Sequence, residues 1–310
     1  MSVSTAQPRA ISKKDRRCPL CAGRSAVAFT VGDRNRGVTA RRFTYDRCFA
    51  CGTFFLADVP TDLGRYYPDD YYRLPSPDEI DVVAAGEAHK LQFLGTAAPP
   101  GRLVDVGAGF GPFARVASRA GYDVTAVEMD ARCCEYLESV VGVAAVRSDN
   151  PADALANLPP SRVVTLWHVL EHLHDPWQVL AAVAENLEPG GAVAIAMPNP
   201  RALQFRLLRG YWAHVDAPRH LFLIPAETLT ARASALGLRR VLLTTDDPAG
   251  RGWNRFGWEY ALRWCPARRR PTRAFTGASM LLTMLLRPWE GRSLNGTAYT
   301  AVFVKQSERE

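Results

Sequence analysis

The chain has 310 residues, of which 47% are hydrophobic, and this suits one large domain with a packed core plus a small one, or two domains. Its formal net charge of +7 is gathered mainly in residues 251–273, which are rich in arginine. No apolar run reaches the roughly 18–20 residues that span a bilayer, and residues 1–17 are polar and basic, which argues against a secretory signal. We therefore expect a cytoplasmic protein whose residues 1–17 form a disordered tail.

Seven cysteines give an odd count, and four of them stand in two C-x-x-C pairs. These four are Cys18, Cys21, Cys48 and Cys51. The pattern indicates a metal site or free thiols rather than a disulfide framework. Two such pairs, with short strands expected at 26–31 and 41–45, predict a zinc ribbon over residues 18–57. Four thiolates close the coordination sphere, so the expected Zn²⁺ is structural.

Residues 58–85 are rich in proline and tyrosine and predict a linker packed on the main domain. Their paired tyrosines, at 66–67 and 71–72, have two interpretations. They are packing residues at a domain seam, or they line a binding cleft.

A short apolar strand at 103–106 runs directly into three alternating glycines, and Glu128 ends the next strand. Gly107, Gly109 and Gly111 allow a tight turn and a close approach of backbone to ligand. The spacing is G-x-G-x-G, not the G-x-G-x-x-G of dinucleotide sites. An adenosine with a small zwitterionic tail, such as S-adenosylmethionine, fits this spacing better. The alternative is a glycine-rich turn without a ligand.

From residue 86 onward the pattern alternates between helix and strand, which predicts a doubly wound parallel α/β sheet over 86–305. Strands are expected at 103–106, 124–127, 143–146, 163–167, 192–197, 239–244 and 300–304, with a turn at 189–191. Helices are expected at 88–94, 112–120, 131–140, 177–187 and 225–236. Insertions at 198–224 and 246–295 interrupt the alternation, and such insertions commonly carry specificity or form lids.

These motifs together resemble the class I S-adenosylmethionine-dependent methyltransferases. The resemblance rests on 104–111, Glu128, the His-Val-Leu-Glu-His-Leu run at 168–173 with its following Asp-Pro, and Leu-Glu-Pro-Gly-Gly at 187–191. It covers roughly residues 86–245. It implies a Rossmann-like sheet of seven strands with the last strand antiparallel. The double C-x-x-C followed by tyrosines resembles a subgroup with an N-terminal zinc-binding module, associated with sugar, polysaccharide and secondary-metabolite biosynthesis.

The resemblance also implies how S-adenosylmethionine would be held. Asp105 and the loop of Gly107, Gly109 and Gly111 would face its methionine part. Glu128 would take both ribose hydroxyls, and Met129 would lie against the adenine. Asp149 would bind the adenine amino group, a task that Ser148 and Asn150 could also perform. Trp167 and His168 would border the cofactor and the acceptor.

For a hydroxyl acceptor the enzyme must align a nucleophile with the methyl group and remove a proton. The segment 211–221 gathers aromatic, histidine and charged residues, and it resembles the acceptor segment of related methyltransferases. His220 is our first candidate base, with His214 second and His168 also at the site, and Arg219 could bind an anionic acceptor group. The alternative is that His220 only orders the loop.

A helix starting near residue 168 would place His168, Glu171 and His172 on one face. Such a face could bind a divalent metal, although the structural interpretation is favoured because the same run is common in family members for which no metal is implied.

We therefore expect O-methylation of a small molecule, a sugar or a glycan precursor. The alternatives are an RNA methyltransferase that uses the ribbon and the basic segment, with Trp253, Phe256 and Trp258 as stacking platforms, and a non-catalytic scaffold. A nucleic acid partner is disfavoured because the arginines lie far from the ribbon in the sequence. Residues 251–289 could contact a membrane surface weakly, although a helical lid at 275–289 is preferred.

Overall fold

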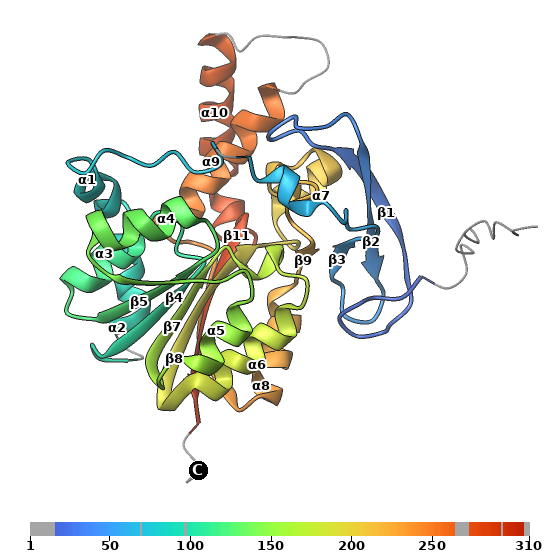
Figure 1. Ribbon diagram of the computed structural model, residues 1–310. Coiled ribbons are helices and arrows are strands. Elements are labelled where there is room, and N and C mark those ends of the chain that lie inside the picture. The colour runs from blue at the N-terminus through green and yellow to red at the C-terminus, as the bar shows by residue number, and fades with distance from the viewer. Residues whose placement is uncertain (1–15, 69, 96–97, 264–272, 293, 307–310) are drawn as a thin grey trace, which may run out of the picture.

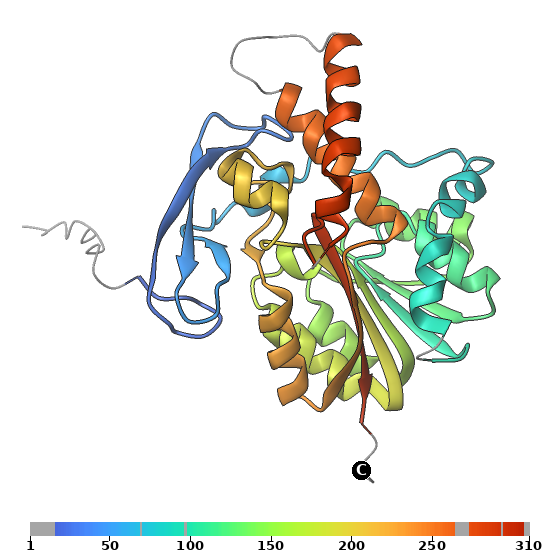
Figure 2. The same ribbon diagram turned by 180° about the vertical axis from the view of Figure 1, so that it is seen from behind.

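The computed structural model describes residues 16–68, 70–95, 98–263, 273–292 and 294–306. Within these ranges the chain forms a seven-stranded sheet with helices on both faces and a separate four-stranded sheet beside it (Figures 1 and 2). Most of the expected tail, residues 1–15, lies outside the described part. Arg16 and Arg17, which were also assigned to the tail, instead contact the small sheet and the turn before it: Arg16 binds the buried carboxylate of Asp46 at 2.8 Å, and the backbone of Arg17 forms an isolated antiparallel bridge with Arg24.

The large sheet has the strand order β10-β11-β8-β7-β4-β5-β6 among the described residues. Its strands are β4 (Arg102–Val106), β5 (Asp123–Glu128), β6 (Ala144–Arg147), β7 (Ser161–Trp167), β8 (Leu187–Pro198), β10 (Leu238–Thr244) and β11 (Ala298–Lys305). Five of them, β4 to β8, are parallel, whereas β11 runs antiparallel to both β8 and β10. The expected seven-stranded sheet with an antiparallel last strand is confirmed.

Alternate side chains of each strand enter two separate cores, one on each face. Val193 and Ile195 of β8 pack into one core, while Ala192 and Ala194 pack into the other. The first core is completed by α5 (Pro151–Asn157), α6 (Pro176–Asn186) and α8 (Ala226–Ala235). The second is completed by α1 (Ile80–Ala85), α2 (Leu91–Gly95), α3 (Pro112–Arg119) and α4 (Ala131–Tyr136). Strands buried on both faces are typical of a parallel sheet.

Local sequence signals fix where several helices begin. The Asp175 side chain accepts hydrogen bonds from the N–H groups of residues 177 and 178 and caps α6, whose first residue is Pro176. Asp130 caps α4 in the same way through the N–H of Arg132. Each cap follows a strand of the parallel sheet and fixes the start of the helix that comes after it.

Two expectations need correction. The strand expected at 192–197 begins at Leu187 and includes the Pro-Gly-Gly expected as a turn, because its pairing with β7 jumps from Leu187 to Ala192 across a bulge. No helix begins at residue 168. His168 has a φ of 60°, and the helical hydrogen bonding that follows is a short 3₁₀ turn, η4 (Leu170–His172).

The small sheet joins distant parts of the chain. Its strands are β1 (Ser25–Gly32), β2 (Arg42–Cys48), β3 (Phe54–Leu56) and β9 (Phe222–Leu223), all antiparallel. The first three belong to the predicted ribbon, but β9 comes from the insertion at 198–224. The ribbon is therefore hydrogen-bonded to the segment that was predicted to bind the acceptor.

The two insertions contribute helices at the same edge of the sheet. The first contains α7 (Leu203–Leu208) and the second contains α9 (Pro248–Arg263) and α10 (Arg273–Glu290). Figures 1 and 2 show α10 rising from the body of the molecule, so it is not a lid packed on the sheet. It exposes the apolar side chains of Met280, Leu281, Met284, Leu285 and Trp289. The arginine triplet at 268–270 lies outside the described residues. None of the described helices has the length and apolarity needed to cross a membrane.

Candidate active site

A cavity of about 1020 Å³ opens at the carboxyl ends of β4, β5 and β7, where ligands bind in doubly wound sheets. At one end it is lined by the glycine loop and Glu128, and at the other by the two insertions, while the tyrosine-rich segment reaches both ends through Tyr72 at Gly109 and Tyr67 at His172. Of the predicted cofactor residues, those that line it are Asp105, Gly107, Gly109, Glu128, Met129, Asp149 and Trp167. The candidate bases His168, His214 and His220 line the same cavity.

The three glycines have different physical roles. All three have positive φ, but Gly111 does not line the cavity. A Cβ on Gly111 would lie 2.4 Å from Leu137 Cδ2, so this glycine allows close helix packing. A Cβ on Gly107 would lie 2.6 Å from Val169, and one on Gly109 would lie 3.1 Å from the Tyr72 ring. Gly111 is thus corrected from a ligand-facing residue to a packing residue.

Glu128 is buried at the end of β5, and its carboxylate accepts three backbone hydrogen bonds. Gly109 N–H donates to Oε2 at 2.8 Å, while Met129 and Asp130 N–H donate to Oε1 at 2.8 and 3.0 Å. A carboxylate has about four acceptor positions. It can therefore hold the glycine loop and still accept from a ribose hydroxyl.

Asp105 is buried beneath the glycine loop at the end of β4. Thr165 Oγ1 donates to its carboxyl group at 2.6 Å. Burial raises the pKa of Asp105 to about 7, although the Thr165 hydrogen bond and the charge of Lys90 act in the opposite direction. A buried carboxyl group with a strongly raised pKa in a cleft is typical of a functional site. At this position it could pair with a ligand's ammonium group.

The tyrosine-rich segment lies over the cavity. Tyr67, Tyr71 and Tyr72 line it, with ring centroids 5.0 Å apart from Tyr67 to Tyr71 and from Tyr71 to Tyr72. Tyr66 instead points away, packing edge-on against Phe43 of the ribbon. Tyr67, Tyr71 and Tyr72 therefore line a cleft, as the second interpretation expects, whereas Tyr66 is a packing residue, as the first expects.

Histidines and one glutamate converge at the acceptor end. His168 Nδ1 lies 3.3 Å from Glu171 Oε1, and the His168 side chain is 27% exposed whereas Glu171 is fully buried. Burial raises the pKa of Glu171, but the hydrogen bond with His168 and the charges of the surrounding imidazoles hold it below its usual range. Burial lowers the pKa of His172 to about 4 and that of His214 to about 3, so both rings are neutral near pH 7.

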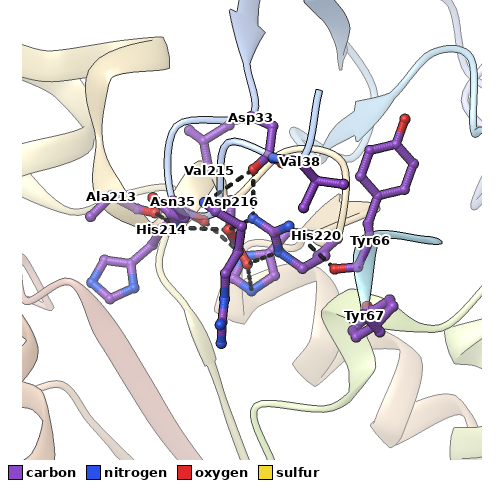
Figure 3. A network of polar contacts seen from close by, with 12 residues as sticks. Asp33, Asn35, Val38, Tyr66, Tyr67, Ala213, His214, Val215, Asp216 and His220 are labelled. Atoms are coloured by element: carbon purple, nitrogen blue, oxygen red, sulfur yellow. Dashed lines mark hydrogen bonds and ion pairs between the residues drawn. The ribbon is translucent and has the colours of Figure 1, made fainter. Parts of the chain in front are cut away.

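The acceptor loop is held in place by the ribbon (Figure 3). Tyr45 of β2 donates its hydroxyl to the carbonyls of Val215 and His220 at 3.2 and 2.6 Å. Asn35, in the loop after β1, donates to Asp216 Oδ1 and to the carbonyl of residue 213. The sequence placed these two regions in separate domains, and nothing in it signalled that they touch.

Arg219, which was expected to bind an anionic acceptor group, lines the cavity but is engaged mainly by carboxylates. Its guanidinium is buried and bonded to Asp216 Oδ1 and Oδ2 at 2.6 and 3.0 Å and to Asp33 Oδ1 at 2.9 Å. Burial alone would lower the pKa of Arg219, but the two carboxylates raise it above its usual value. Three of the five guanidinium N–H donors are used in these ion pairs and Nη1 contacts the carbonyl of Tyr66 at 3.4 Å, so the main role of Arg219 is to fix the loop to the ribbon.

Aromatic side chains from α9 form one wall of the cavity. The Trp253 ring contacts His168 and His214, with centroids 5.8 and 5.2 Å apart, and Phe256 lies 5.9 Å from Trp253. Trp258, by contrast, is buried and donates its Nε1–H to Glu290 at 2.9 Å. Trp258 is therefore not part of an exposed stacking platform, whereas Trp253 and Phe256 are partly exposed in the cavity wall.

The four paired cysteines come together away from this cavity. All four Sγ atoms lie within 4.8 Å of one another, with 3.8 Å from Cys18 to Cys51 and 3.5 Å from Cys21 to Cys48. A tetrahedral zinc ion with Zn–S bonds of about 2.3 Å holds its sulfurs about 3.8 Å apart. Burial raises the pKa of the Cys48 thiol, but hydrogen bonds from backbone and neighbouring cysteines bring it down to about 7. The donor set fits Zn²⁺.

Comparisons with known proteins agree with this geometry. The sequence model of the methyltransferase domain family matches residues 84–243. A ubiquinone biosynthesis O-methyltransferase of Pectobacterium carotovorum is 37% identical over 106 residues, which cover 33% of this chain and 44% of the relative. One from Xanthomonas campestris is 32% identical over 138 residues, covering 43% and 54%. The chain thus spans about half the length of the curated relatives it matches.

A solved structure supports the fold. The S-adenosylmethionine-dependent methyltransferase of Archaeoglobus fulgidus superposes with a TM-score of 0.50 at 18% identity, covering 73% of this chain and 94% of that one. The family match covers more than half of the chain, begins in α1 before the large sheet and ends in β10, so it leaves out β11. The chain therefore belongs to the methyltransferase domain family, on the Rossmann-like fold of the S-adenosylmethionine-dependent methyltransferases and with a four-cysteine module at its N-terminal side.

Proposed function

We propose that this protein is an S-adenosylmethionine-dependent methyltransferase that methylates an oxygen atom of a small-molecule acceptor. The observation that carries the proposal is the single cavity, which joins Glu128 and the glycine loop to a group of histidines. The names of the relatives support oxygen as the methylated atom. The aromatic wall of Trp253 and Phe256 supports a planar acceptor, such as a phenol.

In this proposal Asp105, Glu128 and Asp149 hold the cofactor, as the family resemblance implies. When bound, S-adenosylmethionine supplies a methyl group attached to a positively charged sulfur. The sulfur is the leaving group and keeps the electron pair of the broken S–C bond. The residues must then align the acceptor oxygen, exclude water and take the hydroxyl proton as the O–C bond forms. Tyr67 and Tyr71 line the cavity, where their rings would help to exclude water from the bound acceptor.

We assign the base to His168 ahead of His214 and His220. The His168 side chain is 27% exposed, whereas the His220 side chain is only 11% exposed. Its Nδ1 faces Glu171, which orients the ring and would stabilise a protonated imidazole. His214 is a weaker base because burial lowers its pKa to about 3.

Calorimetry with S-adenosylhomocysteine tests the cofactor site. Glu128→Ala removes a charged acceptor, and such hydrogen bonds contribute about 1.5–3 kcal/mol, so we expect affinity to fall roughly 10- to 100-fold. Glu138→Ala, which changes an exposed glutamate, should leave affinity unchanged. Equal affinity in wild type and Glu128→Ala would contradict the assigned role.

Release of S-adenosylhomocysteine with a panel of acceptors tests the reaction. Phenols and catechols should turn over faster than sugars or glycan precursors, because the cavity wall is aromatic. Turnover only with sugars would overturn the planar acceptor, and turnover only with RNA would overturn the small-molecule class. Membrane contact through 251–289 stays a prediction, which co-sedimentation with anionic vesicles at low and high salt would check.

A further inference from the structure

Three side chains at the acceptor end of the cavity are arranged as metal ligands. Glu171, His172 and His220 each bring one ligating atom within 4.8 Å of the other two. Glu171 and His172 lie in η4, whereas His220 comes from the acceptor loop before β9. The two imidazole rings meet edge to face, with centroids 4.6 Å apart. The fold thus brings together ligands that are separated by almost fifty residues.

Backbone carbonyls determine which nitrogen of each ring carries the proton. His172 Nδ1 lies 3.1 Å from the carbonyl oxygen of Arg219, and His220 Nδ1 lies 2.8 Å from that of His214. The Tyr67 hydroxyl, whose oxygen can also accept, lies 3.0 Å from His172 Nδ1. Since a carbonyl oxygen only accepts, each Nδ1 is the donor and each Nε2 keeps its lone pair. Histidines that bind metals are oriented by the same kind of contact.

Nothing within the described residues uses these free positions. Asp216 Oδ2 lies 4.0 Å from His220 Nε2, which is too far for a hydrogen bond. That carboxylate is already bound by Arg219. Glu171 is fully buried, and its Oε2 has no hydrogen-bond partner in the described part of the chain. A buried carboxylate oxygen without a partner is costly, so its presence points to a ligand.

We propose that Glu171, His172 and His220 bind a divalent transition-metal ion in the acceptor half of the cavity. Two imidazole nitrogens and one carboxylate oxygen suit Zn²⁺, Co²⁺ or Mn²⁺, and three protein ligands leave coordination positions open. His172 and His220 line the cavity, so the open positions face the space assigned to the acceptor. In this respect the inference rests on the proposed function. An acceptor hydroxyl on such an ion would lose its proton to His168 more readily.

Calorimetric titration with Mn²⁺ tests the site in the full-length protein with zinc in its cysteine module. Mn²⁺ prefers nitrogen and oxygen ligands to thiolates, so it separates this site from the four cysteines. We expect one equivalent of Mn²⁺ to bind per chain. His172→Asn and His220→Asn keep an N–H donor for the backbone carbonyl but lose Nε2, and each should weaken Mn²⁺ binding at least tenfold.

His89→Asn is the matched control. Its Nδ1 also contacts a backbone carbonyl, that of Gly86 at 2.9 Å, but it lies outside the cluster, so Mn²⁺ binding should not change. Pulsed electron paramagnetic resonance of Mn²⁺ on the wild type should detect two imidazole nitrogens, and this measurement needs no variant to fold. Absence of Mn²⁺ binding at millimolar concentration, or binding that both variants retain without imidazole signals, would overturn the site.

The same samples separate this inference from the proposed function. Binding of S-adenosylhomocysteine without binding of Mn²⁺ overturns the metal site and leaves the methyltransferase proposal intact. Binding of Mn²⁺ without binding of S-adenosylhomocysteine overturns the methyltransferase proposal and leaves the metal site intact.

Discussion

At the scale of single residues, the site depends on buried groups whose neighbours decide their ionisation. Asp105 and Glu171 are both buried carboxyl groups, yet their pKa values move in opposite directions. Asp105 has the hydroxyl of Thr165 as its hydrogen-bond donor, whereas Glu171 is surrounded by imidazoles. Burial dominates in the first case and charge in the second. The residue types alone do not reveal this difference.

The raised pKa of Asp105 predicts an unusual pH dependence of stability. The folded state holds this proton up to about pH 7, while the unfolded state releases it near the ordinary value of 3.8. Between these values the folded state binds more protons, so the free energy of unfolding falls as pH rises, by at most about 1.4 kcal/mol per pH unit. Asp105→Asn cannot ionise and so does not lose this stability. The free energy of unfolding of the variant, measured by urea titration, should therefore rise relative to that of the wild type between pH 4 and 7.

Asp123→Asn, at the exposed start of β5, serves as the control and should track the wild type at every pH. An advantage of Asp105→Asn that does not depend on pH would contradict the assigned ionisation.

Replacing the proposed base should affect turnover and spare cofactor binding. His168→Gln keeps a polar side chain but cannot take the proton, so kcat should fall by about 10²- to 10⁴-fold. Affinity for S-adenosylhomocysteine should stay within about twofold, as measured by calorimetry. If kcat of His168→Gln matched the wild type while His220→Gln was inactive, the base would be His220 and our assignment would be wrong.

At the scale of elements, the loop between β1 and β2 positions the acceptor loop from the far side. Asp33 accepts from the backbone N–H of Val38, which fixes its own loop, and binds the buried Arg219 at 2.9 Å. The Asp33 carboxylate therefore connects the ribbon to Arg219, while the two Asp216 contacts to Arg219 lie within residues 213–220. The acceptor end of the cavity is built by two elements that are far apart in the sequence.

Breaking this ion pair should be costly. Asp33→Ala leaves the guanidinium of Arg219 with one carboxylate partner fewer in a buried position, and loss of one partner of a buried pair costs about 3–5 kcal/mol. Asp62→Ala removes an exposed ion pair with Arg65 and should change stability by less than about 1 kcal/mol. Chemical unfolding of both variants checks the contrast, and equal losses would contradict it.

At the scale of the whole molecule, the cysteine module supports the acceptor half of the cavity more than the cofactor half. Its strand β3 pairs with β9, and Tyr45 of β2 binds the backbone on both sides of Arg219. Glu128 and the glycine loop, in contrast, are held by the central sheet. The two halves of the cavity therefore depend on different parts of the fold.

Loss of the proposed zinc ion should separate these halves. Cys21→Ser, or removal of zinc by a chelator, should lower the melting temperature of the protein. It should also lower kcat/KM for the acceptor at least tenfold, because the acceptor loop loses its support. Affinity for S-adenosylhomocysteine should stay within about threefold. Cys265→Ser, outside both C-x-x-C pairs, is the control. Turnover that survives with no bound zinc would contradict this coupling.

Local patterns in the sequence were sufficient to predict the sheet, the order of its helices and strands along the chain, the cysteine cluster and most of the residues that line the cavity around the glycine loop. These features depend on residues close together in the chain: a strand, a glycine turn and an acid at the next strand end. Gly111 shows the limit, because its spacing suits a ligand loop while its actual neighbour is Leu137, on a helix that the motif does not include.

Only the tertiary structure decided the acceptor end. The sequence by itself identified His168, His214 and His220 as candidates and grouped Glu171 with His168, but it did not indicate that His220 joins Glu171 and His172, that Asp33 binds Arg219, or that α9 supplies the aromatic wall. Each of these contacts joins segments separated by a long stretch of chain or an insertion. Their geometry is set by which faces of the fold pack together, and no local periodicity encodes that packing.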